Sequence, residues 1–285
     1  IRMDYTTIMP KRARSEKANS PRWLDACIWT PSYLVCSLAL PFFLSMWVKN
    51  PYLISIIGNE ESNSPSIIGL GMGFASVFVG QVSTIVYYHL YNEKPICTPN
   101  ALSEIRRHFS QPEGLLMLGG YLSIYWMSGC MPDSYYSYSG YIRWSHVFYQ
   151  LAIQDGIQYI IHRGEHMIPM IYKNTHAAHH IHTTPMLYDA FDGSVLDTGL
   201  MILLPLLITS RFVNANIWSY MTFGTIYANM LTLIHSKEDH PWDPYARTMG
   251  IGTAEDHRVH HKTFKWNYGH IFTYWDRICD TYLEY

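Results

Sequence analysis

The chain has 285 residues, a formal net charge of −2, 15% aromatic residues and only 15% charged residues. The near-neutral charge argues against a nucleic-acid-binding protein, whereas a charged fraction well below the usual quarter and a mean hydropathy of −0.04 are typical of a membrane protein that also carries a polar domain. The five cysteines, at positions 27, 36, 97, 130 and 279, lack C-x-x-C spacing, so we expect reduced thiols on the cytosolic side or in the bilayer.

The first transmembrane helix is predicted near the start of the chain. Residues 1–28 are polar and basic, without the features of a secretory signal, and we expect a cytosolic or interfacial segment there. No residue from Ile28 to Val48 is charged. Because about 20 apolar residues cross the hydrocarbon core of a bilayer, this stretch predicts a span. Trp29 and Trp47 lie near its ends, where interfacial tryptophans are common.

A second span is predicted at residues 66–90, after a polar loop at 49–65. Gly69 and Gly73 place small residues four positions apart, as do Ser76 and Gly80, and this spacing lets helices approach closely. We therefore expect the first two spans to pair as a hairpin. Six Lys and Arg residues precede the first span and three lie in residues 91–114, against one between the spans. The positive-inside rule then places both flanks in the cytosol.

Two further segments raise the expected number of spans to about four. Residues 115–131 form a shorter apolar run, which either spans the bilayer or re-enters it. Residues 144–167 read as a long helix that ends near Pro169 and carries the first histidines. If both segments cross, the histidines emerge in the cytosol. Residues 194–234 are apolar again and fit either a further hairpin or half-buried helices that cap the histidines.

Nine histidines are grouped at helical spacing in the second half of the chain. His162 and His166 lie four residues apart, and H-x-x-H-H occurs twice, so each group would share one helix face. Asp155 and Tyr159 continue the stripe of His162, which places a carboxylate in position to orient that imidazole. Residues 253–256 read as a capping box before the last group. The nine are His162, His166, His176, His179, His180, His235, His257, His260 and His261.

The number of histidines predicts two metal ions. Burying nine imidazoles without partners would cost about 1–3 kcal/mol each, which is comparable to or larger than a domain stability of roughly 5–15 kcal/mol. A metal removes this cost because each neutral imidazole becomes a ligand. Nine ligands exceed the coordination of one ion, and all-nitrogen ligation suits Fe, Zn, Cu or Ni. The remaining histidines considered are expected to be ordinary residues: His89, His108, His146, His182 and His270.

At these residues the sequence resembles the fatty acid hydroxylase and sterol desaturase superfamily of membrane di-iron oxygenases. The resemblance covers about residues 144–285 and rests on specific motifs. They are D-x-x-x-Y-x-x-H-R-x-x-H (155–166), H-x-x-H-H (176–180), H-S-x-x-D-x-P-W (235–242), D-H-x-x-H-H (256–261), and N-Y-G followed by W-D (267–269 and 275–276). The third motif is most similar to C4-methylsterol oxidases, although Lys237 and Glu238 replace the Gly-Tyr usual in that branch.

The resemblance implies an all-α fold, in which an integral membrane bundle of about four transmembrane helices carries a cytosolic, histidine-rich helical cap with a di-metal site. We divide the chain into an N-terminal segment (1–28), a transmembrane region (29–143) and a fatty acid hydroxylase-like catalytic domain (144–285). The nine clustered histidines would be the metal ligands. Five more residues are considered as further ligands or as groups that support them: Asp155, Tyr159, Asp239, His240 and Asp256.

The implied activity is an O2-dependent monooxygenase reaction in lipid biosynthesis. Two iron ions, which zinc can replace in a purified sample, would oxidise an unactivated C–H bond of a sterol or fatty-acyl lipid; desaturation of a lipid would use the same residues. No flavin or nucleotide motif is visible, so electrons would come from cytochrome b5 and its reductase, or from a ferredoxin. The implied location is the endoplasmic reticulum membrane, with the histidines facing the cytosol and no nucleic acid as partner.

Two other classes of protein remain open at this point. His162, Glu165 and His166 also fit H-x-x-E-H, a zinc-hydrolase motif in which the glutamate is the general base. That hypothesis leaves at least six clustered histidines without a role. A metal-storing or purely structural membrane protein is the other alternative. In the oxygenase interpretation, Glu165 is instead a solvated residue or a group that supports a ligand.

Overall fold

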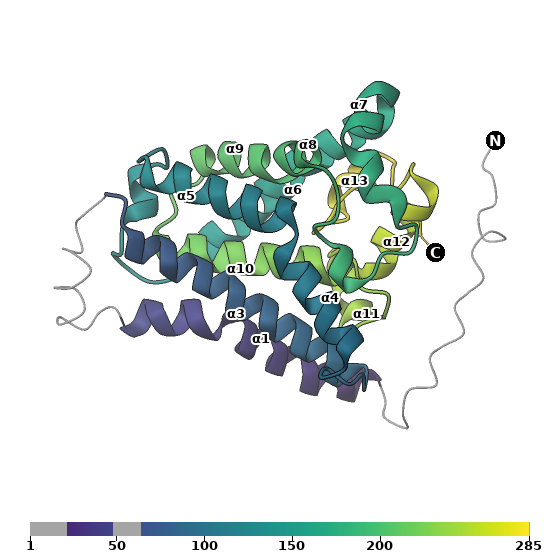
Figure 1. The fold of residues 1–285 in the computed structure, drawn as a ribbon, viewed down its shortest axis with the longest axis horizontal. Coiled ribbons are helices and arrows are strands. Elements are labelled where there is room, and N and C mark those ends of the chain that lie inside the picture. Colours follow the sequence, from purple (N-terminus) through teal and green to yellow (C-terminus); the bar gives the residue numbers. More distant parts are fainter. Residues whose placement is uncertain (1–21, 48–63, 285) are drawn as a thin grey trace.

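The computed structural model describes residues 22–47 and 64–284. The expected N-terminal segment up to residue 21 and most of the expected loop 49–65 lie outside these residues. Within them the chain is helical apart from connecting loops and one isolated β-bridge between Ile251 and Phe272, which confirms the all-α prediction. Figure 1 shows long helices that run side by side, with the short helices α11, α12 and α13 at one end of the molecule.

The helix starts follow local sequence signals. The side chains of Ser66, Thr98, Asn216 and Thr253 each accept a hydrogen bond from a backbone N–H of the first turn of their helix. The elements are α1 (Arg22–Trp47), α3 (Ile67–Tyr91), α4 (Pro99–Ser110), η2 (Glu113–Gly119), α5 (Gly120–Met127), η3 (Asp133–Tyr136), α6 (Trp144–Met167), α7 (Pro169–Asn174), η4 (His176–Ile181), η5 (Leu187–Asp189), α8 (Val195–Thr198), η6 (Gly199–Leu203), α9 (Leu204–Phe212), α10 (Ile217–Ile234), α11 (Asp243–Thr248), α12 (Ala254–Thr263) and α13 (Tyr274–Ile278).

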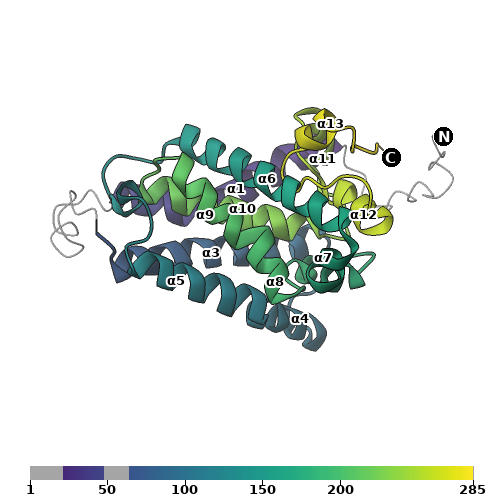
Figure 2. The same ribbon diagram turned by 90° about the horizontal axis from the view of Figure 1, so that it is seen from above.

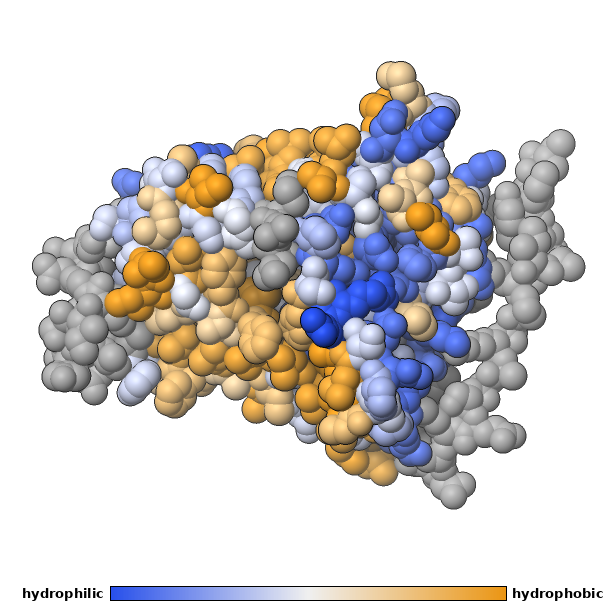
Figure 3. All heavy atoms as spheres, in the orientation of Figure 1, coloured by the Kyte–Doolittle hydropathy of each residue, from blue (hydrophilic) through white to orange (hydrophobic). Residues whose placement is uncertain are grey.

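Three of the described helical stretches are long and apolar enough to cross a membrane: Trp23–Trp47, Ile67–Tyr91 and Val195–Phe212. The first two agree with the predicted spans, and the third lies in the region whose sequence fits two arrangements. Helix α6 has the predicted extent but is not among them, because its sequence is too polar; Gln150, Gln154 and Asp155 are among the polar residues that it buries. Figure 3 shows hydrophobic residues over the long helices and hydrophilic residues toward the end that holds α11 to α13.

Helix α10 is the central helix of the bundle. It contacts α1, α3 and α6, and Figure 2 shows it between α6 on one side and α3 and α5 on the other. Of its 18 residues, 13 are buried, so α10 belongs to the protein core rather than to a lipid-facing hairpin. Because α10 ends at Ile234, its core packing fixes the position of His235, the next residue.

The small residues of α3 serve its packing against α10. A Cβ atom added at Gly80 would lie 2.6 Å from Cγ2 of Thr225 and 3.0 Å from Nδ2 of Asn229. The next residue, Gln81, donates from Nε2 to Oδ1 of Asn229 at 3.0 Å. Helix α1 does pack on α3, as predicted for a hairpin, but the close approach that Gly80 permits is directed at α10.

Candidate metal centre

The structure brings together all nine histidines that the sequence grouped. Their ligand nitrogens form two groups, in each of which the nitrogens lie within 4.8 Å of one another, and all of the residues are buried except the half-buried His166. The first group contains His162, His166, His176, His180 and His260, and the second contains His179, His235, His257 and His261. Helix α6, η4, α12 and the residue after α10 supply them, so segments up to 99 residues apart along the chain build one site.

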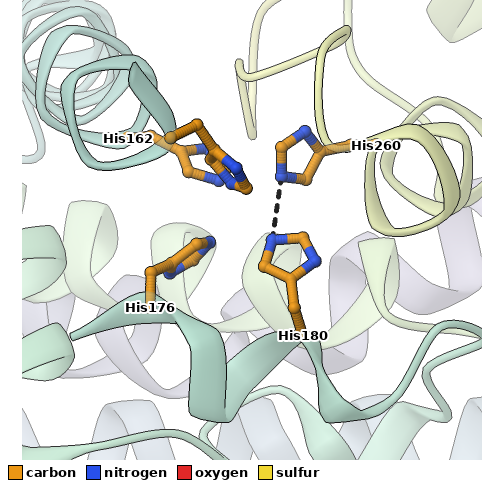
Figure 4. A group of neighbouring side chains, drawn as sticks. His162, His176, His180 and His260 are labelled. Carbon is orange, nitrogen blue, oxygen red and sulfur yellow. Dashed lines mark hydrogen bonds between the residues drawn. The ribbon is translucent and has the colours of Figure 1, made fainter. Parts of the chain in front are cut away.

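The first group surrounds a common point. Figure 4 shows the rings of His162, His176, His180 and His260 directed toward one another. The Nε2 atoms of His180 and His260 are 3.1 Å apart. The Nε2 atoms of His162 and His176 are buried and have no hydrogen-bond partner. Unpaired buried nitrogens of this kind are costly in an apolar interior, and a cation at their centre would satisfy them.

The second group has a chain of close contacts between Nε2 atoms. Nε2 of His235 lies 3.1 Å from Nε2 of His179 and 3.0 Å from Nε2 of His257, which is 3.1 Å from Nε2 of His261. Nitrogens bound to one ion at about 2.0–2.1 Å are separated by roughly 3 Å or slightly more. The spacing in this group therefore fits imidazoles that share one metal ion.

Hydrogen bonds at Nδ1 fix which nitrogen faces the centre in five of the nine rings. A carbonyl oxygen only accepts, so a ring nitrogen bonded to it must carry the proton, and Nε2 then presents a lone pair. Such bonds join Nδ1 of His162 to Tyr268 (2.7 Å), His179 to Asp192 (2.9 Å), His235 to Leu231 (2.6 Å), His260 to Trp266 (2.8 Å) and His261 to His182 (2.9 Å). Facing lone pairs, such as those of His179 and His235, repel unless a cation lies between them.

Burial keeps these imidazoles neutral. Desolvation, together with neighbouring histidines, lowers the pKa of His180 to about 2 and holds the pKa of His257, His260 and His261 well below the ordinary value. Neutral imidazole is the form that binds metals. The donor set, the spacing and the protonation state therefore fit two metal ions, although all-nitrogen ligation alone does not identify the metal.

The histidines of η4 differ from the sequence prediction. The spacing placed His176, His179 and His180 on one face of an α-helix, but η4 is a 3-10 helix. His176 and His180 belong to the first group and His179 to the second. The winding of this turn therefore differs from the α-helix that the spacing predicted, and the turn contributes ligands to both groups.

Asp155 supports the site differently from the prediction. Its buried carboxylate does not orient His162; it accepts the backbone N–H groups of His270, Ile271 and Phe272 at 3.1, 2.8 and 2.9 Å. Those residues belong to the loop whose Tyr268 carbonyl accepts from His162. The carboxylate therefore acts on His162 through the loop.

The remaining residues considered as ligands or supports lie outside the two groups. Tyr159 bonds Thr281 through its hydroxyl, and Asp256 forms the predicted capping box with Thr253. The side chain of Asp239 is 55% exposed. His240 bonds the hydroxyl of Tyr87 through Nδ1 at 3.0 Å. The geometry gives none of these residues a place in the groups.

Three carboxylate or imidazole side chains near the centre have surroundings that the sequence predicted only in part or not at all. Asp197 accepts from Nδ1 of His176 at 2.7 Å, although nothing in its local sequence marks it. Glu165 is buried, 4.0 Å from Nδ1 of His176, so the prediction of a solvated residue is wrong and the supporting role fits. His270, expected to be ordinary, lies between the groups, with its ring centroid 4.9 Å from that of His162 and 5.2 Å from that of His257.

An apolar cavity of about 580 Å³ lies between α3, α5 and α10. Along α10 its lining extends from Ile217 to Leu231, which is a distance of about 21 Å at about 1.5 Å per residue. The carbonyl of Leu231 accepts from Nδ1 of His235. One end of the cavity is therefore one helical turn from the second histidine group. Glycines contribute to the lining on α3 and α5, among them Gly73 and Gly120.

Comparison with known proteins identifies relatives of the chain. The family model "Fatty acid hydroxylase" matches residues 147–281. The chain is 40% identical over 286 residues to the alternative squalene epoxidase of Phaeodactylum tricornutum, covering 94% of this chain and 81% of that protein. It is 33% identical over 132 residues to methylsterol monooxygenase 1 of Danio rerio, covering 46% of this chain and 44% of the relative. It is also 30% identical over 182 residues to the Delta(7)-sterol 5(6)-desaturase of Leptosphaeria maculans, covering 62% of this chain and 46% of that relative.

The chain spans less than half the length of the latter two relatives. No solved structure matches it. The long match to the first relative nevertheless shows that the chain belongs to the fatty acid hydroxylase and sterol desaturase superfamily of membrane histidine-box oxygenases. It is therefore an oxidoreductase, and the zinc-hydrolase interpretation of residues 162–166 is wrong.

Proposed function

We propose that this member of the superfamily is a membrane-bound di-iron monooxygenase that epoxidises a long isoprenoid hydrocarbon of the squalene type. The cavity carries this proposal, because its apolar lining runs for about 21 Å along α10 and ends one turn from His235. An elongated hydrocarbon lacks polar groups, and a long apolar wall is what can bind it. The similarity to an alternative squalene epoxidase over 94% of the chain supports the same substrate class.

The nine histidines would hold the two ions, and bound iron would supply the reduction of O2 and the transfer of one oxygen atom to a carbon–carbon double bond. The balanced reaction consumes one alkene, O2, two electrons and two protons, and yields one epoxide and water. Carbonyl bonds at Nδ1 fix five of the rings so that each presents an Nε2 lone pair, and burial of the histidines excludes water.

External electrons are part of the proposal. We propose cytochrome b5 and its reductase, or a ferredoxin, as the donor, and the endoplasmic reticulum membrane as the location, with the histidine groups facing the cytosol. The three helical stretches that could cross a membrane support an integral, multi-pass protein. The lipid would then enter the cavity from the bilayer, because residues of the candidate spans Ile67–Tyr91 and Val195–Phe212 line it.

Oxidation of a C4-methylsterol is the second candidate function. The H-S-x-x-D-x-P-W sequence at residues 235–242 and the relationship to methylsterol monooxygenase 1 favour it. Oxygen would then enter a C–H bond instead of a double bond. Desaturation of a lipid on the same scaffold is a third outcome, which lipid mass spectrometry distinguishes from the other two.

Lipid mass spectrometry tests the proposal in cells whose own squalene epoxidase is inactive. Expression of the chain should convert squalene into a product heavier by one oxygen atom, and the His260→Ala variant should not. Oxidised methylsterols with unchanged squalene would favour the second candidate. A product lighter by two hydrogens would identify a desaturase and overturn the proposal.

A pair of glycine variants tests the cavity itself. Gly73 lines the cavity, and a Cβ added there lies 3.9 Å from Cγ of Met221, so the side chain of Gly73→Phe should fill part of the cavity. Gly71 is exposed on the same helix and has nothing within 4 Å of an added Cβ, so Gly71→Phe is the matched control. We expect the first variant to lose at least tenfold in epoxide formation with its metal content unchanged. Equal activity in both variants would contradict this use of the cavity.

A further inference from the structure

The segment around α7 exposes apolar side chains next to the metal centre. Met167, Ile168 and Met170, which we call the α7 apex, are 68%, 47% and 74% exposed. Single exposed apolar residues are common, but here three lie within four positions, followed by the exposed Lys173. Figure 1 shows α7 standing out from the body of the molecule above α8. Such a protruding apolar patch indicates a surface with a partner.

A hydrogen bond fixes the place of α7 relative to a membrane span. The hydroxyl of Ser194 donates to the carbonyl of Thr175 at 2.8 Å. Thr175 is the C-cap of α7, and Ser194 is the N-cap of α8, where the apolar stretch Val195–Phe212 begins. The first residues of that stretch, Val195 and Leu196, are themselves 50% and 58% exposed. The α7 apex is therefore tied to the start of a candidate span whose first residues are exposed and apolar.

We propose that the α7 apex inserts into the interfacial layer of the bilayer, beside the start of the span Val195–Phe212. Interfacial elements bury apolar side chains about 5–10 Å into the boundary between headgroups and acyl chains. Lys173, at the end of α7, is placed to reach lipid phosphates, since long cationic side chains extend toward headgroups. A bilayer is favoured over a second copy of the chain, because the apex is tied to the start of a stretch that is long and apolar enough to cross a membrane.

Membrane contact at α7 would bear directly on the metal centre. Helix α7 joins α6, which carries His166, to η4, which begins at His176. Its Tyr172 ring lies 5.0 Å from the ring of His166 and 6.0 Å from that of His180. Insertion of the apex would thus fix α7, the connection between the two ligand-bearing elements α6 and η4.

Spin labelling of the protein in lipid nanodiscs tests this placement. In a variant whose native cysteines are replaced, a nitroxide at Met170→Cys is compared with labels at Phe212→Cys, which lies in the span and is 69% exposed, and at Lys265→Cys, an exposed residue beyond α12. Oxygen concentrates in lipid and a water-soluble nickel chelate does not. We expect the ratio of oxygen to nickel accessibility at 170 to be several-fold above that at 265 and nearer to that at 212.

Two results would overturn the proposal. Equal ratios at 170 and 265 would place the apex in water. Dipolar broadening at 170 that disappears when each nanodisc holds one copy would make the partner a second chain. Metal content equal to that of the unlabelled protein confirms folding, and a label at Met167→Cys gives an independent second position.

Discussion

The carboxylate of Asp155 is predicted to hold the loop at residues 268–272, whose Tyr268 carbonyl orients the ligand His162. In Asp155→Asn, one oxygen becomes an NH2 group, so the N–H of Phe272, which donates to Oδ2, faces another donor. Leaving one buried donor unsatisfied costs about 1–3 kcal/mol. At roughly 2–4 °C per kcal/mol for a large domain, the variant should melt about 2–12 °C lower. Asp155→Ala removes all three acceptor bonds and should cost about 3–9 kcal/mol by the same figure.

Thermal unfolding followed by tryptophan fluorescence in detergent, with metal content measured in parallel, checks this prediction. Because the same loop supplies the carbonyl that accepts from His162, the Asn variant should also bind metal about 10–100-fold more weakly, as when outer ligand supports are removed. Asp239→Asn is the control, since that side chain is 55% exposed. Wild-type melting and full metal retention in Asp155→Asn would refute the reasoning, and metal loss in the control would restore Asp239 as a ligand.

Three further outcomes are expected. His260→Ala should lose metal and product formation. His89→Ala should keep its metal, because the ring that it removes bonds a tyrosine hydroxyl away from both groups. Equal metal content in the two variants would contradict the ligand assignment. Gly80→Leu should prevent normal packing of α3 on α10, because its Cβ would lie 2.6 Å from Thr225, and a variant that folds with wild-type stability would contradict the proposed close approach. Burial lowers the pKa of His180 to about 2, so this imidazole stays neutral in the folded state, whereas in the unfolded state it takes up a proton near about pH 6.5. The metal-free protein should therefore melt at progressively lower temperature as the pH falls from 7 to 5. A melting temperature that does not change with pH would exclude this linkage.

Local signals in the sequence are sufficient for several elements of the fold. Pro169 correctly marks the end of α6, and Thr253 with Asp256 marks the start of α12. Periodicity and an uncharged run of sufficient length locate α1 and α3. These features depend on neighbours within a few residues, so the sequence contains them directly. The grouping of the nine histidines also follows, because so many imidazoles at helical spacing can be buried together at low cost only around metal ions.

Long-range partners could not be inferred in the same way. Nothing near Asp197 shows that it accepts from His176, and nothing near Asp155 shows that it accepts from a loop more than a hundred residues later. Likewise, small residues on α3 indicate a close helix approach but do not say which helix approaches. Such pairings are set by how whole helices pack. In the same way, the spacing of the η4 histidines does not show that His179 joins a different group from His176 and His180.

The alternation within η4 has a consequence for how the protein would acquire its metals. His179 and His180 are neighbours in the chain but belong to different groups. The first ion to bind would fix the backbone of this turn and thereby prearrange the ligand of the other site. Loading should then be cooperative: in a titration of the metal-free protein, species with one ion would be scarce, and chelation should strip both ions together.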